Sequence, residues 1–88
     1  MKLEDSLIEY PCDFPIKVMG RSQQGFAQAI TEVVLRHDPH FSVASMEMRS
    51  SKTARFLSLT CTVRATSRQQ LDAIYQELCD HPMVVMVL

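Results

Sequence analysis

The stretch ARFLSLTCTVRA at residues 54–65 constrains the fold of this chain more than any other part of its sequence. Apolar side chains alternate there with small hydroxyls: Leu57, Leu59, Cys61 and Val63 against Ser58, Thr60 and Thr62. Such alternation is typical of a β-strand that buries one face and leaves the other in water. We therefore expect a strand whose hydroxyl face is open to solvent, to a ligand or to a partner protein.

Three other segments predict strands that pair with the first. Residues 14–20 alternate in the same way, and Gly20 is expected to end that strand. In residues 41–48 the alternation slips between Val43 and Ala44, which predicts a β-bulge on an edge strand. Residues 83–88 form a β-branched apolar run that is too short for a helix and predicts the last strand.

Two segments carry apolar residues at steps of three and four, which predicts amphipathic helices. The first is expected to be capped by Ser22 and to end at Asp38, with Gly25 weakening its first turn. The second begins at Ser67, whose spacing from Gln70 matches a capping box. Residues 1–13 are expected to form a polar lead-in with one short helical turn.

This order of elements predicts an α+β fold and one domain over residues 1–88. Right-handed crossovers convert strand, helix, strand, strand, helix, strand into a ferredoxin-like βαββαβ two-layer sandwich. Its four-stranded antiparallel sheet carries both helices on one face, with the first and third strands central. The opposite face of the sheet stays uncovered.

Composition excludes several classes of function. A formal net charge of −1 and charged residues spread along the chain do not indicate binding to nucleic acid. No apolar run reaches the roughly 20 residues that cross a bilayer, so no membrane association is expected. Three cysteines without a Cys-x-x-Cys pair favour free thiols in a reducing compartment, and we expect a cytoplasmic protein.

The sequence predicts neither a catalytic residue, nor a metal site, nor a cofactor. His37 with His40 and Cys79 with His81 resemble metal ligands, but they end different helices without the usual paired spacing. With two glycines in the chain, no glycine-rich phosphate loop can form. An enzyme is therefore the least supported class of function.

The uncovered face and the last strand supply the candidate binding surface. Three interpretations remain open: a solvated face, a subunit interface, and a platform for a small molecule. The last strand favours an interface, because one layer of helices cannot bury all its apolar residues and an uncovered edge invites pairing. The candidate residues are Lys17, Met19, Ser51, Lys52, Thr60, Thr62, Val85 and Val87.

Several short motifs together resemble the YbeD-like family of small conserved bacterial proteins. They are KVMG at 17–20, the Val33, Val34, Arg36 and His37 set, SSK at 50–52, and MVL at 86–88. The resemblance implies a ferredoxin-like fold similar to ACT regulatory domains, an undetermined biochemical function, and a gene neighbourhood linked to lipoate attachment. After SSK the family tends to have glycine, whereas this chain has Thr53.

These observations predict a non-catalytic regulatory or protein-interaction module that forms a homodimer. The alternative is a small-molecule effector sensor, with the effector bound near Lys17, Ser51 and Lys52 at a subunit interface.

Overall fold

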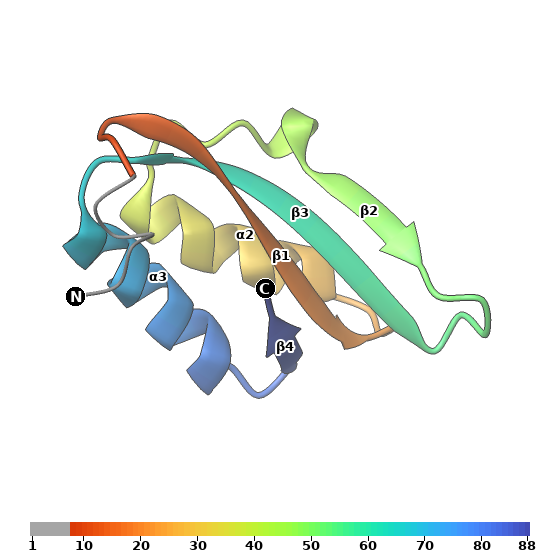
Figure 1. The fold of residues 1–88 in the computed structure, drawn as a ribbon. Coiled ribbons are helices and arrows are strands. Elements are labelled where there is room, and N and C mark those ends of the chain that lie inside the picture. The colour runs from red at the N-terminus through yellow and green to blue at the C-terminus, as the bar shows by residue number, and fades with distance from the viewer. Residues whose placement is uncertain (1–7) are drawn as a thin grey trace.

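The computed structural model describes residues 8–88 and contains the predicted order of elements (Figure 1). They are β1 Cys12–Arg21, α2 Phe26–His37, a short 3-10 turn at Val43–Ser45, β2 Glu47–Ser50, β3 Phe56–Ala65, α3 Arg68–Asp80 and β4 Val84–Val87. Most of the helical turn expected in the lead-in falls on residues 1–7, outside the described residues. Within residues 8–88 no helix is long and apolar enough to cross a membrane.

The sheet has the predicted topology. Its strand order is β2-β3-β1-β4, with all three pairings antiparallel and the long strands β1 and β3 in the centre. Both helices lie on one side of this sheet, as Figure 1 shows. The ferredoxin-like two-layer sandwich is thereby confirmed.

The core forms where the alternation of β3 meets the helices. Leu59, Cys61 and Val63 are fully buried, together with Ile16 and Val18 of β1. The helices contribute Phe26, Ile30, Val33, Val34, Ile74 and Leu78, all at most 1% exposed. Leu57 and Phe14, which the alternation also places inward, are partly buried against this cluster.

Gly20 lies inside β1 and does not end it, because the strand runs on to Arg21. A Cβ at Gly20 would lie 2.5 Å from Cε1 of Phe26 and closer still to the carbonyl oxygen of Met83. The Phe26 ring therefore packs directly on the backbone of β1. Glycine is required here by close approach rather than by strand termination.

The start of α2 also differs from the prediction. Its N-cap is Gly25, with φ 86°, and no side chain caps the helix, so the expected cap at Ser22 is wrong. The backbone N–H of Ser22 donates instead to the carbonyl of Arg55 at 2.7 Å, beyond the end of the β1–β3 pair. Gly25 thus turns the chain before the helix and does not weaken a turn within it.

Residues 41–48 do not form one bulged strand. The backbone N–H groups of Ser45 and Met46 donate to the carbonyls of Ser42 and Val43, each at 3.1 Å, which makes the short 3-10 turn. The slip in the alternation therefore marks this turn, and β2 is limited to Glu47–Ser50. A register shift does occur in the sheet, but between β1 and β4 at Met19 and Gly20.

The second helix begins as predicted. The hydroxyl of Ser67 accepts a hydrogen bond from the backbone N–H of Gln70 at 3.0 Å. The side chain of Gln70 reaches back to the N–H of Thr66 at 2.6 Å, one residue before the one that a capping box predicts. Hydrogen bonds accepted by the side chains of Ser67 and Gln70 therefore hold the start of α3 in place.

Two carboxylates hold the helix layer in place, and the sequence alone indicated neither. Asp38, at the end of α2, is 6% exposed and accepts hydrogen bonds from the backbone N–H groups of Arg64 at 2.9 Å and His40 at 3.3 Å. Arg64 lies on β3 past the end of β2, where its N–H has no strand to pair with. Asp38 therefore connects α2 to the edge of β3.

Glu77 of α3 binds two side chains of α2. It forms an ion pair with Arg36, and its Oε1 lies 2.7 Å from Nε2 of His37. The hydrogen bond from Arg36, followed by that from His37, lowers the pKa of Glu77 below its ordinary value. This carboxylate links the two helices.

Candidate functional site

The side of the sheet opposite the helices, here called the outer face, carries polar and apolar residues together. It presents Lys17, Met19 and Arg21 from β1, Phe56, Ser58, Thr60, Thr62 and Arg64 from β3, and Glu47 and Arg49 from β2. No helix in the described part of the chain covers it (Figure 1). The outer face is therefore the largest surface of the sheet on which a ligand or partner could bind.

Register brings these side chains into rows across the strands. One row runs from Arg49 through Ser58 and Met19 to Met86, so the two methionines are register partners and Ser58 separates them from Arg49. The neighbouring row joins Glu47, Thr60 and Lys17. At the end of the sheet, the Arg21 guanidinium lies 5.9 Å from the centre of the Phe56 ring, a cation–π arrangement.

Four predicted site residues, Lys17, Met19, Thr60 and Thr62, share the outer side of the sheet. Lys17 is the register partner of Thr60, and Met19 and Thr62 lie on the same face. Val85 is 60% exposed on β4. Val87 does not belong to this surface, because it pairs with the buried Val18 and packs against the core. Register at the β1–β4 pair, which the sequence does not show, decides which valines face outward.

Ser51 and Lys52 belong to the turn between β2 and β3, away from Lys17. The Ser51 hydroxyl accepts the N–H of Phe56 at 3.1 Å, so it holds the turn together. Lys17 is level with Thr60 and Ser51 is level with Phe56, a separation of roughly 13 Å along β3. The structure therefore does not bring Lys17 to Ser51 and Lys52 as one effector site.

The same turn contains a residue in the left-handed region. Ala54 has φ 61°, and its N–H donates to the carbonyl of Ser51 at 2.9 Å. The position that favours glycine is thus Ala54, one residue after Thr53.

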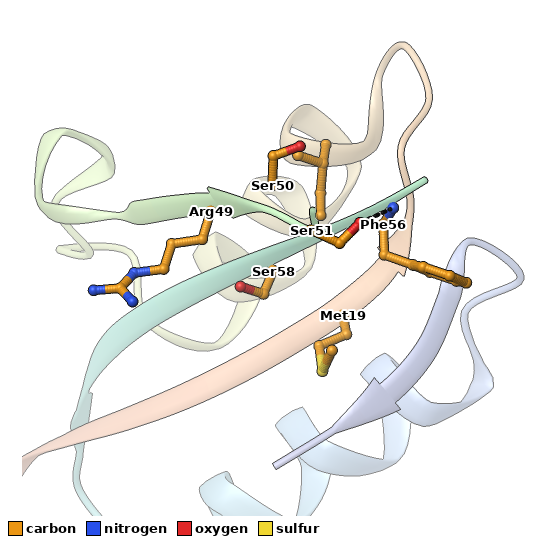
Figure 2. A pocket seen from close by; sticks show the side chains of 7 residues that line it. Met19, Arg49, Ser50, Ser51, Phe56 and Ser58 are labelled. Atoms are coloured by element: carbon orange, nitrogen blue, oxygen red, sulfur yellow. Dashed lines mark hydrogen bonds between the residues drawn. The ribbon is translucent and has the colours of Figure 1, made fainter. Parts of the chain in front are cut away.

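A shallow hollow lies at the end of the outer face near this turn. Figure 2 shows its lining, which consists of Met19, Arg49, Ser50, Ser51, Phe56, Leu57 and Ser58. Its volume is about 100 Å³. Pockets for drug-sized ligands usually measure about 300–1,000 Å³. The hollow fits one side chain of a partner better than a whole metabolite.

Arg49 lines the hollow but is not among the residues that the sequence predicts for the site. The predicted edge strand covers residues 41–48 and does not include it, whereas the structure places it on β2 opposite Ser58. In Figure 2 its side chain extends along the sheet in the direction away from Phe56. The hairpin register would have indicated it, because a residue opposite Ser58 must share the hydroxyl face.

Charge is distributed unevenly between the two layers. Cations lie on the sheet and its turn: Lys17, Arg21, Arg49, Lys52, Arg55 and Arg64. Of the eight acids among residues 8–88, five lie on the helices or at the end of α2: Glu32, Asp38, Asp72, Glu77 and Asp80. The helices also carry Arg36 and Arg68. The outer face thus carries four cations, Lys17, Arg21, Arg49 and Arg64, against the two acids Asp13 and Glu47, although the chain as a whole has a formal net charge of −1.

The described residues show no assembled reactive group. Burial raises the pKa of the Cys61 thiol to about 11, which keeps it neutral and poorly nucleophilic. His37 is engaged by Glu77, and Nδ1 of His81 accepts the N–H of Met83 at 3.1 Å. Across residues 8–88 no group of three or more histidine, cysteine or acidic side chains could hold a metal ion.

Comparison with known proteins identifies the family. The family described as "Protein of unknown function (DUF493)" matches residues 5–88. The chain belongs to this family. The UPF0250 protein NE1487 of Nitrosomonas europaea is 60% identical over 97% of this chain and 98% of the relative. A UPF0250 protein of Bordetella pertussis is 64% identical over 97% of this chain and 93% of the relative. The resemblance to small conserved bacterial proteins of undetermined function is confirmed.

Solved structures show the same fold. The solution structure of protein HP0495 from H. pylori superposes with a TM-score of 0.75 at 22% identity, over 92% of this chain and 85% of that one. The ACT domain from GTP pyrophosphokinase of Chlorobium tepidum superposes with a TM-score of 0.68 at 16% identity, over 88% and 97%. The similarity to ACT domains that the sequence implied is therefore confirmed at the level of fold.

Proposed function

We propose that this chain is a non-catalytic regulatory module that binds a partner protein on the outer face of its sheet. The observation that carries the proposal is the row of Arg49, Ser58, Met19 and Met86 across the sheet, left uncovered by the helices. An exposed apolar patch rimmed by polar residues is typical of a protein-binding surface, and methionine and arginine are enriched in such surfaces. The partner surface that fits is acidic and offers an apolar side chain to the hollow beside Phe56.

The ACT-like fold supports a regulatory role, because an ACT domain occurs in a GTP pyrophosphokinase. The size of the hollow, about 100 Å³, favours a side chain over a free metabolite. A location in the cytoplasm, as expected from the free cysteines, accords with this role and stays a prediction.

A photo-crosslinking side chain at position 19 tests the proposal in native cells. A matched probe at Glu32, which is exposed on α2 in the helix layer, serves as the control. Position 19 should give one or a few discrete protein adducts that position 32 does not give. The same adducts from both probes, or adducts from position 32 alone, would contradict the proposal.

An effector sensor is the second candidate, favoured by the hollow and by the cations around it. Thermal-shift measurements with amino acids, nucleotides and lipoyl compounds test it; the lipoyl compounds follow from the implied link to lipoate attachment. A specific ligand at a hundred times its dissociation constant adds about 2.7 kcal/mol to stability. A shift that Arg49→Ala abolishes would support this candidate over a partner protein.

A further inference from the structure

The free edge of β2 is an exposed strand edge with no partner in the described part of the chain. All four residues of this strand, Glu47–Ser50, are exposed, and β3 occupies one of its edges. Met48 faces the helix side, opposite Leu59, yet it is 54% exposed because the helices do not reach over β2. An edge strand with an uncovered apolar residue invites a further strand.

The hydrogen-bond pattern shows which groups this edge offers. The N–H of Ser51 donates to the carbonyl of Phe56 at 2.9 Å, just beyond the β2–β3 ladder. Antiparallel pairs alternate between hydrogen-bonded and non-hydrogen-bonded positions. Arg49 and Glu47 therefore bond to β3, and the N–H and carbonyl groups of Met48 and Ser50 point outward.

Charge selects one register among those that this edge permits. With a two-fold axis at Met48, Glu47 of each copy lies opposite Arg49 of the other, and Met48 lies opposite Met48. Moving the axis by one residue places Arg49 opposite Arg49, or Glu47 opposite Glu47. Opposite charges across a strand pair stabilise it and like charges destabilise it. Neither Glu47 nor Arg49 has an ion-pair partner elsewhere within residues 8–88.

We infer that two copies pair through antiparallel β2 strands centred on Met48, which gives a continuous eight-stranded sheet with all helices on one side. The two outer faces then form one surface, and Glu47 of the second copy lies beside Arg49 at the hollow. This pairing makes a second copy of the chain one partner in the proposed function. Only in that respect does it rest on the proposed function.

Charge reversal tests this register directly. Sedimentation equilibrium should show a dimer for the wild type, and Glu47→Arg and Arg49→Glu should each weaken dimerisation by about tenfold or more. An equimolar mixture of the two variants should form heterodimers at least as tight as the wild-type dimer, because every facing pair is again of opposite charge. The matched controls are Glu32→Arg and Arg55→Glu, alone and mixed, which should behave as the wild type does.

Three results would overturn the inference: a wild type that stays monomeric at high micromolar concentration, variants that dimerise normally, or a mixture that fails to associate. Circular dichroism checks that each variant is folded. These results leave the crosslinking from position 19 unaffected, so a failure of this pairing is distinguishable from a failure of the proposed function.

Disulfide trapping gives a second readout. With Cys12 and Cys79 changed to serine, Met48→Cys should form an intermolecular disulfide, since Cα atoms in a hydrogen-bonded pair lie about 5.5 Å apart. Ser50→Cys is the control, because in this register it faces Met46 of the second copy. Equal crosslinking of the two variants, or none from Met48→Cys, would contradict the register.

Discussion

On β3, Leu59, Cys61 and Val63 are fully buried, whereas their neighbour Thr62 is exposed on the opposite face. Both faces belong to the same strand, but the helix layer covers only the face that carries Leu59, Cys61 and Val63. The inner face provides the apolar burial that stabilises the fold. The outer face is therefore free to vary for function, and substitutions on the two faces should differ sharply in their effects.

The largest difference is expected between neighbouring residues on opposite faces. Leu59→Ala should lower the free energy of unfolding by roughly 2–5 kcal/mol, because it leaves a cavity beneath the helices. Thr60→Ala, one residue on, should lower it by less than about 1 kcal/mol. Urea unfolding of both variants measures the contrast, and similar losses at the two positions would contradict the two-face description.

A smaller effect is expected where the helix layer is tied to the sheet. Asp38→Ala should lower the free energy of unfolding by about 1.5–3 kcal/mol, since it removes a buried carboxylate that accepts hydrogen bonds from the N–H groups of Arg64 and His40. Asp38→Asn, which keeps one accepting oxygen, should lose less. Amide exchange at Arg64 should quicken in Asp38→Ala. Unchanged exchange there would show that Asp38 does not hold this edge.

The close contact between Gly20 of β1 and Phe26 of α2 allows a covered glycine to be compared with an open one. Gly20→Ala should destabilise the protein by about 1–3 kcal/mol, because the added methyl meets the Phe26 ring and the Met83 carbonyl. Gly25 is the matched control, since a Cβ there meets nothing within 4 Å and only its φ of 86° is unfavourable. Gly25→Asn should therefore cost less than about 1 kcal/mol, because its only penalty is the positive φ, which asparagine tolerates better than most residues. Equal losses from Gly20→Ala and Gly25→Asn would refute the steric account.

The smallest effect concerns the link between the helices and depends on pH. The pKa of Glu77 is lowered in the folded state, so its stabilisation is present above the ordinary pKa of the carboxyl and is lost as pH falls through the lowered value. Glu77→Gln should be less stable than the wild type at neutral pH by about 1 kcal/mol at most, since the pair is partly exposed. Thermal unfolding at a series of pH values should show the two proteins converging in acid. A constant difference would rule out this ionic contribution.

Local patterns were sufficient to predict most of the fold. The alternation around Leu59 and the capping pair Ser67 and Gln70 depend on neighbours in sequence, and both match the structure. The prediction for Gly20 is wrong because its role depends on contact with Phe26. The sequence does not indicate the role of Asp38, because it depends on the N–H of Arg64. Only the folded chain brings these partners into contact.

The candidate site was predicted in part for the same reason. Period-two alternation places Met19 and Thr62 outward without further information. Placing Arg49 and Val87 requires the pairing register, which is set by the short β2 and by the shift between β1 and β4. A one-residue change in register moves a side chain to the other face, so sequence alone could not place these two.

Thiol labelling of neighbouring positions tests most directly whether the sheet has one covered and one open face. One protein keeps Cys61 as its only cysteine, and the other carries Thr62→Cys as its only cysteine. The account predicts that the thiol at position 62 reacts about as fast as an unfolded one, whereas Cys61 reacts at least about a thousandfold more slowly, by unfolding. Comparable rates at the two positions in the folded proteins would contradict it.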